Sequence, residues 1–197
     1  MTSKRHKQTD DDAVLDAARE CVLAVGVRRT TLTDIARRAG VSRMTLYRRW
    51  PDVRSIVADL MTREWTALAA EISAAGRDAS GPARRALVDN LVEGVRALRD
   101  HPLLRKIVDV DPELLLPYVL HRQGASQRAF CRILEEAVRA GHADGSIRRG
   151  DPVRQARALL LIAQSFALSA PIVTDAEHTA GDFDAELREI LERALRP

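Results

Sequence analysis

The stretch from Thr31 to Trp50 constrains the fold of this chain more than any other part of its sequence. Thr31 precedes Asp34 by three positions, a capping pattern that begins a helix, and Gly40 permits the sharp turn that ends that helix. Ser42 can then cap a second short helix, whose inward residues lie four positions apart. Two short helices joined by a tight turn predict a helix-turn-helix. The second helix has the size and shape that enter the major groove of DNA.

Positive charge gathers in the same region. Residues 27–50 contain seven arginines and one acid, a local net charge of +6, whereas the whole chain carries only +3. A patch of this kind attracts the phosphate backbone of nucleic acid through counterion release. Arginine runs are often only solvated helical faces. The charge therefore supports DNA binding together with the caps, the turn glycine and the apolar spacing, and not by itself.

The run T-L-T-D-I-A-R-R-A-G-V-S-x-x-T-L-Y-R-R-W-P, which begins at Thr31, resembles the DNA-binding signature of TetR-type transcriptional regulators. The resemblance covers Asp12 to about Ile56. Beyond that segment the chain matches the family only in its length and its helical character. The resemblance implies a DNA-reading head that a long helix connects to a C-terminal domain for a ligand and a second subunit.

The expected recognition helix spans residues 43–49. Side chains near the N-terminus of such a helix reach base edges, so Arg43, Met44 and Thr45 are the expected base-reading residues. An arginine there most often reads guanine, and a methionine can contact the methyl group of thymine. The resemblance implies that Thr45, Tyr47 and Arg49 lie near phosphates and that Arg48 lies near bases or backbone. The helix before it would meet the DNA backbone at Thr31 and Thr33. The predicted DNA-binding residues are Thr31, Thr33, Arg43, Met44, Thr45, Tyr47, Arg48, Arg49 and Arg54.

Three positions near this helix carry alternatives or departures from the family. Tyr47 can pack its ring inside and present only its hydroxyl group outward. TetR-type relatives often have glycine or proline where this chain has Met44, so the base preference stays open. Many relatives also carry a phosphate-binding lysine where this chain has Val53. The adjacent Arg54 can replace it, although it points about 100° away around the helix.

The N-terminal residues 1–9 are polar and basic, and we expect an unstructured arm. Such an arm can lie along DNA or stay a loose terminus. Apolar residues recur on one helical face from Val14 to Val25, which predicts a first helix from about Asp11. This helix completes a DNA-binding domain over residues 10–52, and residues 53–197 form the predicted ligand-binding and dimerisation domain.

The predicted fold class is all-α, with an N-terminal three-helix helix-turn-helix domain and a larger C-terminal helical domain. No strand-like alternation persists along the chain. Pro117 should kink or restart one of the C-terminal helices, because proline removes a helical hydrogen bond. The expected C-terminal helices span residues 52–75, 83–99, 113–121, 124–140, 152–170 and 183–195, with a short segment at 103–108.

The last two helices are the predicted dimer interface. Residues 158–170 are apolar nearly all round, which indicates a helix buried on several sides, and residues 183–195 carry a matching stripe. Pairing with a second copy would give a four-helix bundle, and packing within one chain is the alternative. The predicted interface residues are Leu159, Ala163, Phe166, Leu187, Ile190, Leu191 and Ala194.

The sequence offers no arrangement suited to catalysis. The five histidines show no metal-binding spacing, and no serine lies in a nucleophile elbow. We expect the acids Asp109, Asp111 and Glu113 to begin a helix and not to bind a metal. Cys21 and Cys131 lie far apart and are expected as small core residues, with redox sensing as the alternative. We therefore expect no enzyme activity, no metal and no cofactor.

The resemblance also implies a ligand cavity inside the C-terminal helices. A largely aliphatic domain suits a small, hydrophobic effector, whose identity the sequence does not give. Each lining residue is also compatible with an ordinary core or surface position. The residues expected to line the cavity are Trp65, Tyr118, His121, Arg122 and Gln164.

The expected function is that of a homodimer that binds a palindromic double-stranded DNA operator and leaves it when an effector binds. Repression is expected from the family and not from any residue. No signal peptide or membrane-spanning run is visible, so we expect a cytoplasmic protein without a membrane partner. The alternative is a helical small-molecule or lipid carrier with a vestigial DNA-binding head, which the Val53 position alone supports.

Overall fold

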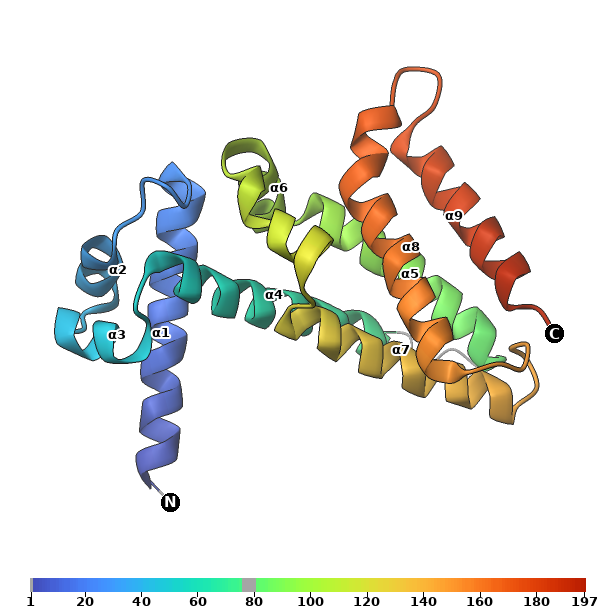
Figure 1. Ribbon diagram of the computed structural model, residues 1–197, viewed down its shortest axis with the longest axis horizontal. Helices are drawn as coiled ribbons and strands as arrows, with labels where there is room; N and C mark the ends of the chain where they lie inside the picture. Colours follow the sequence, from blue (N-terminus) through green and yellow to red (C-terminus); the bar gives the residue numbers. More distant parts are fainter. Residues whose placement is uncertain (1, 76–80) are drawn as a thin grey trace. The chain divides into compact units, whose positions relative to one another are not determined.

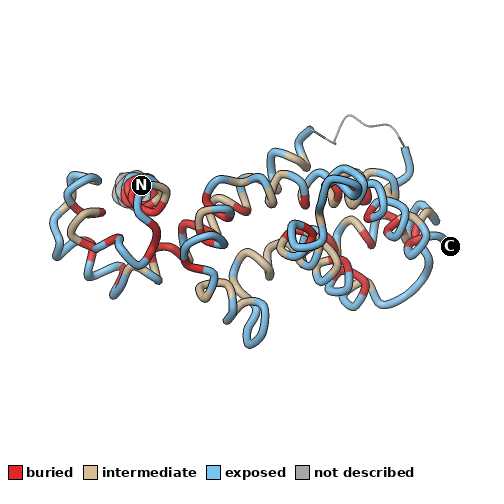
Figure 2. The backbone as a smooth tube through the Cα atoms, turned by 90° about the horizontal axis from the view of Figure 1, so that it is seen from above, coloured by how far each residue is buried: buried red, intermediate tan, exposed pale blue. Residues whose placement is uncertain are grey.

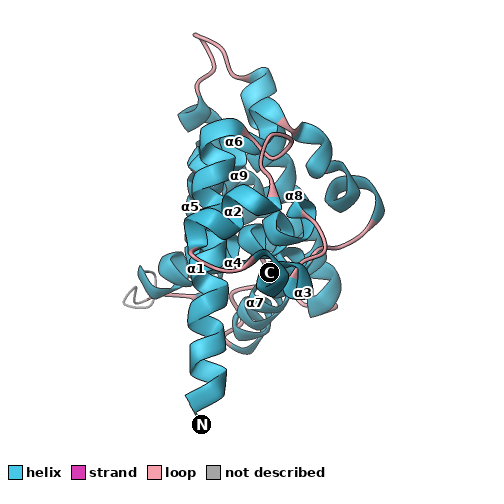
Figure 3. Ribbon diagram, turned by 90° about the vertical axis from the view of Figure 1, so that its left-hand side faces the viewer, coloured by secondary structure: helices cyan, strands magenta, loops and turns pink. Residues whose placement is uncertain are grey.

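The computed structural model describes residues 2–75 and 81–197, with side chains from residue 11 onward. Regular structure in these ranges is entirely helical, which confirms the predicted fold class (Figure 1, Figure 3). The elements are α1 (Thr2–Val25), α2 (Leu32–Ala39), α3 (Arg43–Arg49), α4 (Val53–Ala75), α5 (Ala83–Asp100), α6 (Pro102–Val110), η2 (Pro112–Leu114), η3 (Pro117–His121), α7 (Ala125–Ala143), α8 (Pro152–Val173) and α9 (Ala180–Leu195).

The chain packs into two compact units. The first contains Met1–Glu64 and His101–Arg122, and the second contains Trp65–Asp100 and Gln123–Pro197. Helix α4 contributes to both units, because the division falls inside it. The boundary predicted after residue 52 lies before α4 and assigns α6 to the C-terminal domain, whereas the packing groups α6 with the N-terminal helices.

The first unit contains the three predicted N-terminal helices. Helix α1 packs against α2, α2 packs against α3, and α6 also packs against α1. Val22, Ile35 and Leu46 are among the inward side chains, each at most 1% exposed. Helix α1 begins at Thr2 and not near Asp11, so the segment predicted as an unstructured arm continues the helix. Residues 2–9 contain no glycine or proline and several strong helix formers, which explains the difference.

Both predicted caps of the helix-turn-helix are confirmed. The hydroxyl oxygen of Thr31 accepts a hydrogen bond from the Asp34 N–H group at 3.1 Å, and Ser42 accepts one from the Thr45 N–H group at 3.1 Å. Gly40 has a φ of 69°, in the left-handed region that glycine adopts without strain. Interactions within a few residues therefore set the ends of α2 and the start of α3.

The second unit is built around one aliphatic core. Helix α5 packs against α7, α8 and α9, and α7 also packs against α8. Figure 2 marks the buried positions in red. The core includes Leu87, Val88, Val92, Val95, Leu134, Val138, Ile147, Ala156, Leu159, Leu187, Leu191 and Leu195.

One buried ion pair joins α5 to α9 inside this unit. The guanidinium group of Arg99 donates to both carboxylate oxygens of Asp184, at 2.9 and 3.0 Å, and Arg96 donates a third hydrogen bond at 3.3 Å. Burial alone would raise the pKa of Asp184, but these two arginines outweigh that effect and hold the pKa below its ordinary value. The carboxylate is therefore charged and paired at neutral pH.

Prolines divide the segment between α6 and α7 into two short turns. Where a helix over residues 113–121 with a kink or a restart at Pro117 was predicted, this segment contains a 3-10 turn, η2, and one π-helical turn, η3, which restarts at Pro117. Pro112 begins the first turn and Pro117 begins the second. Proline has no N–H group to donate to the preceding turn, so each one starts a new short helix. Helix α8, by contrast, continues through Pro171 to Val173, beyond its predicted end.

Candidate DNA-binding surface

Helix α3 exposes nearly all of its side chains. Leu46 is its buried residue, at 1% exposed, and it anchors the helix. Met44 is 78% exposed and Tyr47 is 52% exposed, so the tyrosine ring presents about half of its surface to solvent. Arg43 and Thr45 are exposed as well. The side of α3 away from Leu46 is therefore free to enter a groove.

The N-terminus of α3 presents two side chains without an internal role. Arg43 and Met44 are exposed, and both follow the cap residue Ser42 directly. The hydroxyl group of Thr45 lies 2.9 Å from the hydroxyl group of Ser42, so it belongs partly to the cap. Arg43 and Met44 are consequently the best placed of the predicted base-reading residues.

Ion pairs neutralise some of the arginines in this region. Arg37 pairs with Asp34 at 2.8 Å within α2, and Arg38 pairs with Glu20 of α1 at 2.5 Å. These two arginines lie on the first helix of the helix-turn-helix. Their charge is already balanced before any nucleic acid arrives.

Arg49 is also engaged, although it was predicted to contact phosphate. Its Nε atom lies 3.5 Å from the Asp11 carboxylate, and its guanidinium group lies over the Trp50 ring at 5.3 Å from the centroid. The Arg49 and Asp11 side chains are 54% and 32% exposed, so their ion pair can exchange, whereas the Trp50 ring is buried. A phosphate contact by Arg49 therefore competes with Asp11.

Within residues 27–54, four arginines make no ion pair with any side chain of residues 11–75 or 81–197, and all four are exposed. Three of them belong to the predicted DNA-binding set, and the fourth lies in the loop between α1 and α2. Sequence reasoning missed that fourth arginine, because acids on distant segments decide which arginines are neutralised. The four are Arg29, Arg43, Arg48 and Arg54.

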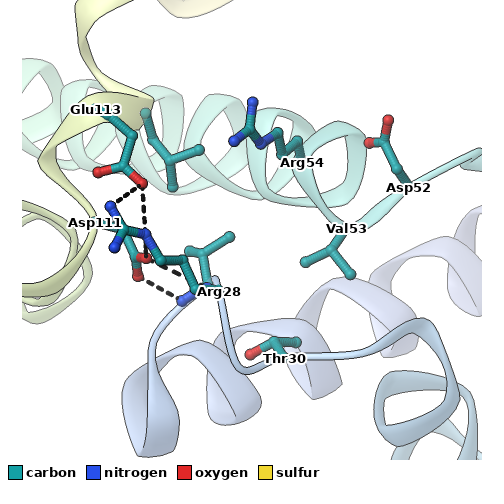
Figure 4. A pocket seen from close by; sticks show the side chains of 9 residues that line it. Arg28, Thr30, Asp52, Val53, Arg54, Asp111 and Glu113 are labelled. Atoms are coloured by element: carbon teal, nitrogen blue, oxygen red, sulfur yellow. Dashed lines mark hydrogen bonds and ion pairs between the residues drawn. The ribbon is translucent and has the colours of Figure 1, made fainter.

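The remaining predicted DNA-binding residues lie at helix starts. Thr31 is exposed, and its hydroxyl group donates to the Asp34 carboxylate at 2.6 Å, which lowers the pKa of Asp34. Thr33 is half-buried. Arg54 follows Val53 at the start of α4, and both line a hollow of about 400 Å³ in the first unit (Figure 4).

The residues predicted to line a ligand cavity fall in both units. Tyr118, His121 and Arg122 belong to the first unit, where the Arg122 guanidinium group lies 5.2 Å from the centroid of the Tyr118 ring. Trp65 and Gln164 belong to the second unit. Trp65 is 5% exposed, and Gln164 accepts a hydrogen bond from a side-chain amide of α7 at 2.6 Å. Their role in a ligand cavity stays a prediction.

Several predicted interface residues lie in the core of the chain itself. Leu159, Leu187 and Leu191 are at most 3% exposed and belong to the aliphatic core of the second unit. Ala163 and Phe166 are half-buried against the same core. The stripe that the sequence assigned to a second subunit therefore packs mainly within its own chain, and buried side chains offer no surface to a partner.

Other side chains of α8 and α9 remain exposed. On α8, Leu161 is 67% exposed and Ile172 is 81% exposed, and on α9 Ile190 is 38% exposed. Ala194 is exposed as well. Within the described residues, α8 is the one helix that is long and apolar enough to cross a membrane, by length and composition alone. Its apolar surface is thus larger than its own chain covers.

Comparison with known proteins identifies the family. Residues 14–60 match the family described as bacterial regulatory proteins, tetR family. An uncharacterized HTH-type transcriptional regulator of Mycobacterium tuberculosis is 42% identical over 160 residues, which cover 81% of each chain. The chain belongs to the TetR family. This TetR-family protein is accordingly a DNA-binding transcriptional regulator, in a family of regulators and not of enzymes.

Solved structures share the fold of this TetR-family protein over nearly its whole length. The transcriptional repressor QsdR of R. erythropolis, also from the TetR family, has a TM-score of 0.70 at 19% identity and covers 96% of this chain and 97% of its own. SmeT, in complex with triclosan, has a TM-score of 0.63 at 22% identity and covers 96% of this chain and 92% of its own. At this identity the likeness concerns the fold alone.

Proposed function

We propose that this TetR-family protein is a homodimeric repressor that binds a palindromic DNA operator and is released by a small, hydrophobic ligand. The exposure of α3 carries the proposal. Of its seven residues Leu46 alone is buried, and Arg43 and Arg48 form no ion pair with a described side chain. Unpaired guanidinium groups on an exposed helix suit the base edges and phosphates of a major groove.

The proposed contacts divide into base readout and phosphate binding. Arg43 and Met44 lie at the exposed N-terminus of α3, so we assign them to base edges. Arg48 lies near bases or backbone. The remaining residues of the set bind phosphates, which fix the register of the protein without reading sequence. The phosphate set is Thr31, Thr33, Thr45, Tyr47, Arg49 and Arg54.

The proposed dimer forms through the exposed sides of α8 and α9. Leu161 and Ile172 are eleven positions apart, about three helical turns, and so lie on the same side of α8. Ile190 and Ala194 are four apart on α9 and also share a side. Apolar side chains exposed to this degree in a soluble protein mark an interaction surface. A two-fold pairing would place two α3 helices on the two half-sites of a palindrome.

Ligand release and repression rest on the family. SmeT, which shares this fold, binds triclosan, a small hydrophobic molecule. QsdR, which also shares it, is a transcriptional repressor. Release requires that the ligand favour the conformation that misplaces the two α3 helices, and a coupling of about 1–3 kcal/mol is enough. A repressor of this kind acts in the cytoplasm.

Selection of bound duplexes from a random DNA pool tests the proposal. We expect the chain to enrich a palindrome with half-sites about one helical turn apart, and we expect its affinity to fall steeply as salt rises. Thermal-shift screening of small molecules then identifies ligands, which should both stabilise the protein and weaken its binding to the selected duplex.

Two outcomes would contradict the proposal. If the pool yields no enriched sequence and binding stays uniform, the chain does not read an operator. If ligands stabilise the protein strongly while no duplex binds at low salt, the protein is better described as a small-molecule carrier.

A further inference from the structure

A buried carboxylate ties the end of α6 to the loop between α1 and α2. Asp111 is 1% exposed, and its carboxylate accepts hydrogen bonds from the N–H groups of Val27 at 2.7 Å and Arg28 at 3.3 Å. The partners lie 84 and 83 positions earlier in the chain. We call this set, the Asp111 carboxylate with the Val27 and Arg28 N–H groups, the Asp111 clamp.

The fit around the clamp is close. Gly26, the residue before it in the loop, has a φ of 83°. A Cβ atom at this position would lie 2.8 Å from Val110 Cγ1 and 3.0 Å from the Asp111 carboxylate. Cβ atoms essentially never approach another heavy atom to within less than 3.0 Å, so the loop can lie against Val110 in this way only because residue 26 has no side chain. The end of α6 therefore fixes where the loop lies.

The Arg28 side chain adds a second, more exposed tie. Its guanidinium group lies 3.4 Å from Asp111 and 2.7 Å from Glu113. Figure 4 shows it between the two carboxylates. The Arg28 side chain is 68% exposed, so this ion pair contributes little by itself. The buried hydrogen bonds to backbone N–H groups are the stronger part of the connection, because an unpaired buried N–H group is costly.

The loop leads directly into the helix-turn-helix. Thr30 is 6% exposed, and its hydroxyl group donates to the Gly26 carbonyl oxygen at 2.7 Å, which closes the loop on itself. The next residue, Thr31, caps α2. Helix α2 in turn packs against α3. A loop fixed by Asp111 therefore sets the start of α2 and, through α2, the orientation of α3.

We propose that Asp111 is a positioning residue for DNA binding, through which α6 completes the DNA-reading head. The proposal rests on the proposed reading of DNA by α3 and adds that the head is discontinuous in sequence. Without the clamp, the head still carries its positive charge but no longer holds α2 and α3 in the orientation that base readout needs. Specific binding should therefore suffer more than non-specific binding.

The test compares two duplexes and three variants of the full chain. The duplexes are the one selected by the wild-type chain and a shuffled duplex of the same length and composition. Asp111→Asn and Asp111→Ala remove the clamp charge, and Asp109→Asn makes the same change of charge at an exposed residue of α6. Removal of an acid alone should tighten binding to any DNA, so a weakened variant cannot be explained by charge.

We expect Asp111→Asn to weaken binding to the selected duplex by about tenfold, and Asp111→Ala by more, with less than about a threefold change on the shuffled duplex. Asp109→Asn should bind both duplexes at least as tightly as the wild type does. Wild-type affinity of Asp111→Asn for the selected duplex overturns the proposal. So does an equal loss on both duplexes with loss of the cooperative thermal transition, because Asp111 would then be needed only for folding.

Amide hydrogen exchange tests the clamp in the wild-type chain, where folding is not in question. The Val27 amide should exchange at least about tenfold more slowly than the amide of Arg29, which the clamp does not hold. Equal exchange rates would overturn the clamp. If the wild-type chain binds the selected and the shuffled duplex equally, the proposed reading of DNA by α3 is wrong. The exchange experiment tests the Asp111 clamp independently of that result.

Discussion

Helices α3 and α8 differ in the kind of side chain that they expose. Helix α3 exposes unpaired arginines, whereas α8 exposes large apolar side chains, with Leu161 at 67% and Ile172 at 81%. Hydration of a guanidinium group is favourable, whereas exposure of an isoleucine side chain to water is unfavourable in free energy. The difference agrees with the roles proposed above, in which α3 binds DNA reversibly and α8 is covered permanently by a second subunit.

The largest predicted change in free energy concerns self-association and should come from a charge placed on α8. We expect Leu161→Glu to weaken self-association by about 4 kcal/mol, roughly a thousandfold, because a two-fold interface would bury two unpaired carboxylates. Sedimentation at a series of protein concentrations measures the change. Ile133→Glu on α7 is the matched control, since Ile133 is 40% exposed but lies outside the proposed interface. If Leu161→Glu and Ile133→Glu weaken self-association equally, α8 is not the preferred interface.

The next largest change concerns the free energy of unfolding and should come from the buried ion pair between α5 and α9 in the second unit. We expect Asp184→Asn to lower the free energy of unfolding by roughly 3 kcal/mol at pH 7, because Arg99 loses its carboxylate in a largely buried site. Asp89→Asn is the control, because it breaks an exposed pair with Arg188 between the same helices and should cost less than about 1 kcal/mol.

The Asp184 effect should also depend on pH. The pKa of Asp184 is lower in the folded chain than in the unfolded chain, so its stabilisation is present above the unfolded pKa of about 3.9 and is lost as the pH falls through the folded pKa. Urea unfolding of wild type and Asp184→Asn should therefore converge below about pH 4. A constant difference down to pH 2 would mean that the carboxylate charge is not the source of the stability.

A smaller change, in the free energy of discrimination between base pairs, should distinguish base readout by α3 from its general attraction to DNA. We expect Arg43→Ala to lose about 1–3 kcal/mol of discrimination at one base pair of the selected duplex, because the guanidinium group reads a base edge. Binding to a panel of single-base variants of that duplex measures it. Arg37→Ala is the control, because Arg37 is already paired with Asp34. Unchanged base preference in Arg43→Ala would mean that another part of α3 faces the bases.

The smallest effect should come from Arg49. We expect Arg49→Ala to weaken binding to all sequences alike and to reduce the slope of log affinity against log salt by at most about 0.9, since Asp11 already shares its charge. Affinities at several salt concentrations give the slope. An altered base preference would show that Arg49, and not Arg43, lies toward the base edges.

The elements that the sequence predicted well depend on neighbours a few residues away. The Thr31 and Ser42 caps and the Gly40 turn are of this kind, because each is decided by local hydrogen bonds or by backbone freedom. The apolar spacing of α1 likewise identified Val14 and Val22 as inward residues. These signals were enough to indicate the fold and the DNA-reading helix.

The features that the sequence did not predict depend on distant partners. Spacing could not show that Glu20 and Glu113 neutralise Arg38 and Arg28 and leave Arg29 unpaired. Asp111 and Glu113 lie at the start of a short helix, η2, as expected, but the sequence did not indicate that Asp111 is buried against a loop 84 positions earlier.

Helix α8 shows the same limit for apolar residues. A helix that is apolar nearly all round has no periodicity that tells its inner face from its outer face. The sequence therefore assigned Leu159 to a partner, although Leu159 lies in the core and Leu161 is exposed. Only the packed structure distinguishes the two sides.

The contact between Arg49 and Trp50 gives this protein a spectroscopic property. Trp50 ends α3, donates its indole N–H group to Asp59 at 2.8 Å and lies beneath the Arg49 guanidinium group at 5.3 Å. The chain has two tryptophans, so a Trp65→Phe chain would fluoresce from Trp50 alone. If Arg49 moves from the ring to a phosphate, as proposed, the emission of that indole should change, and DNA binding could then be followed in real time without an attached dye.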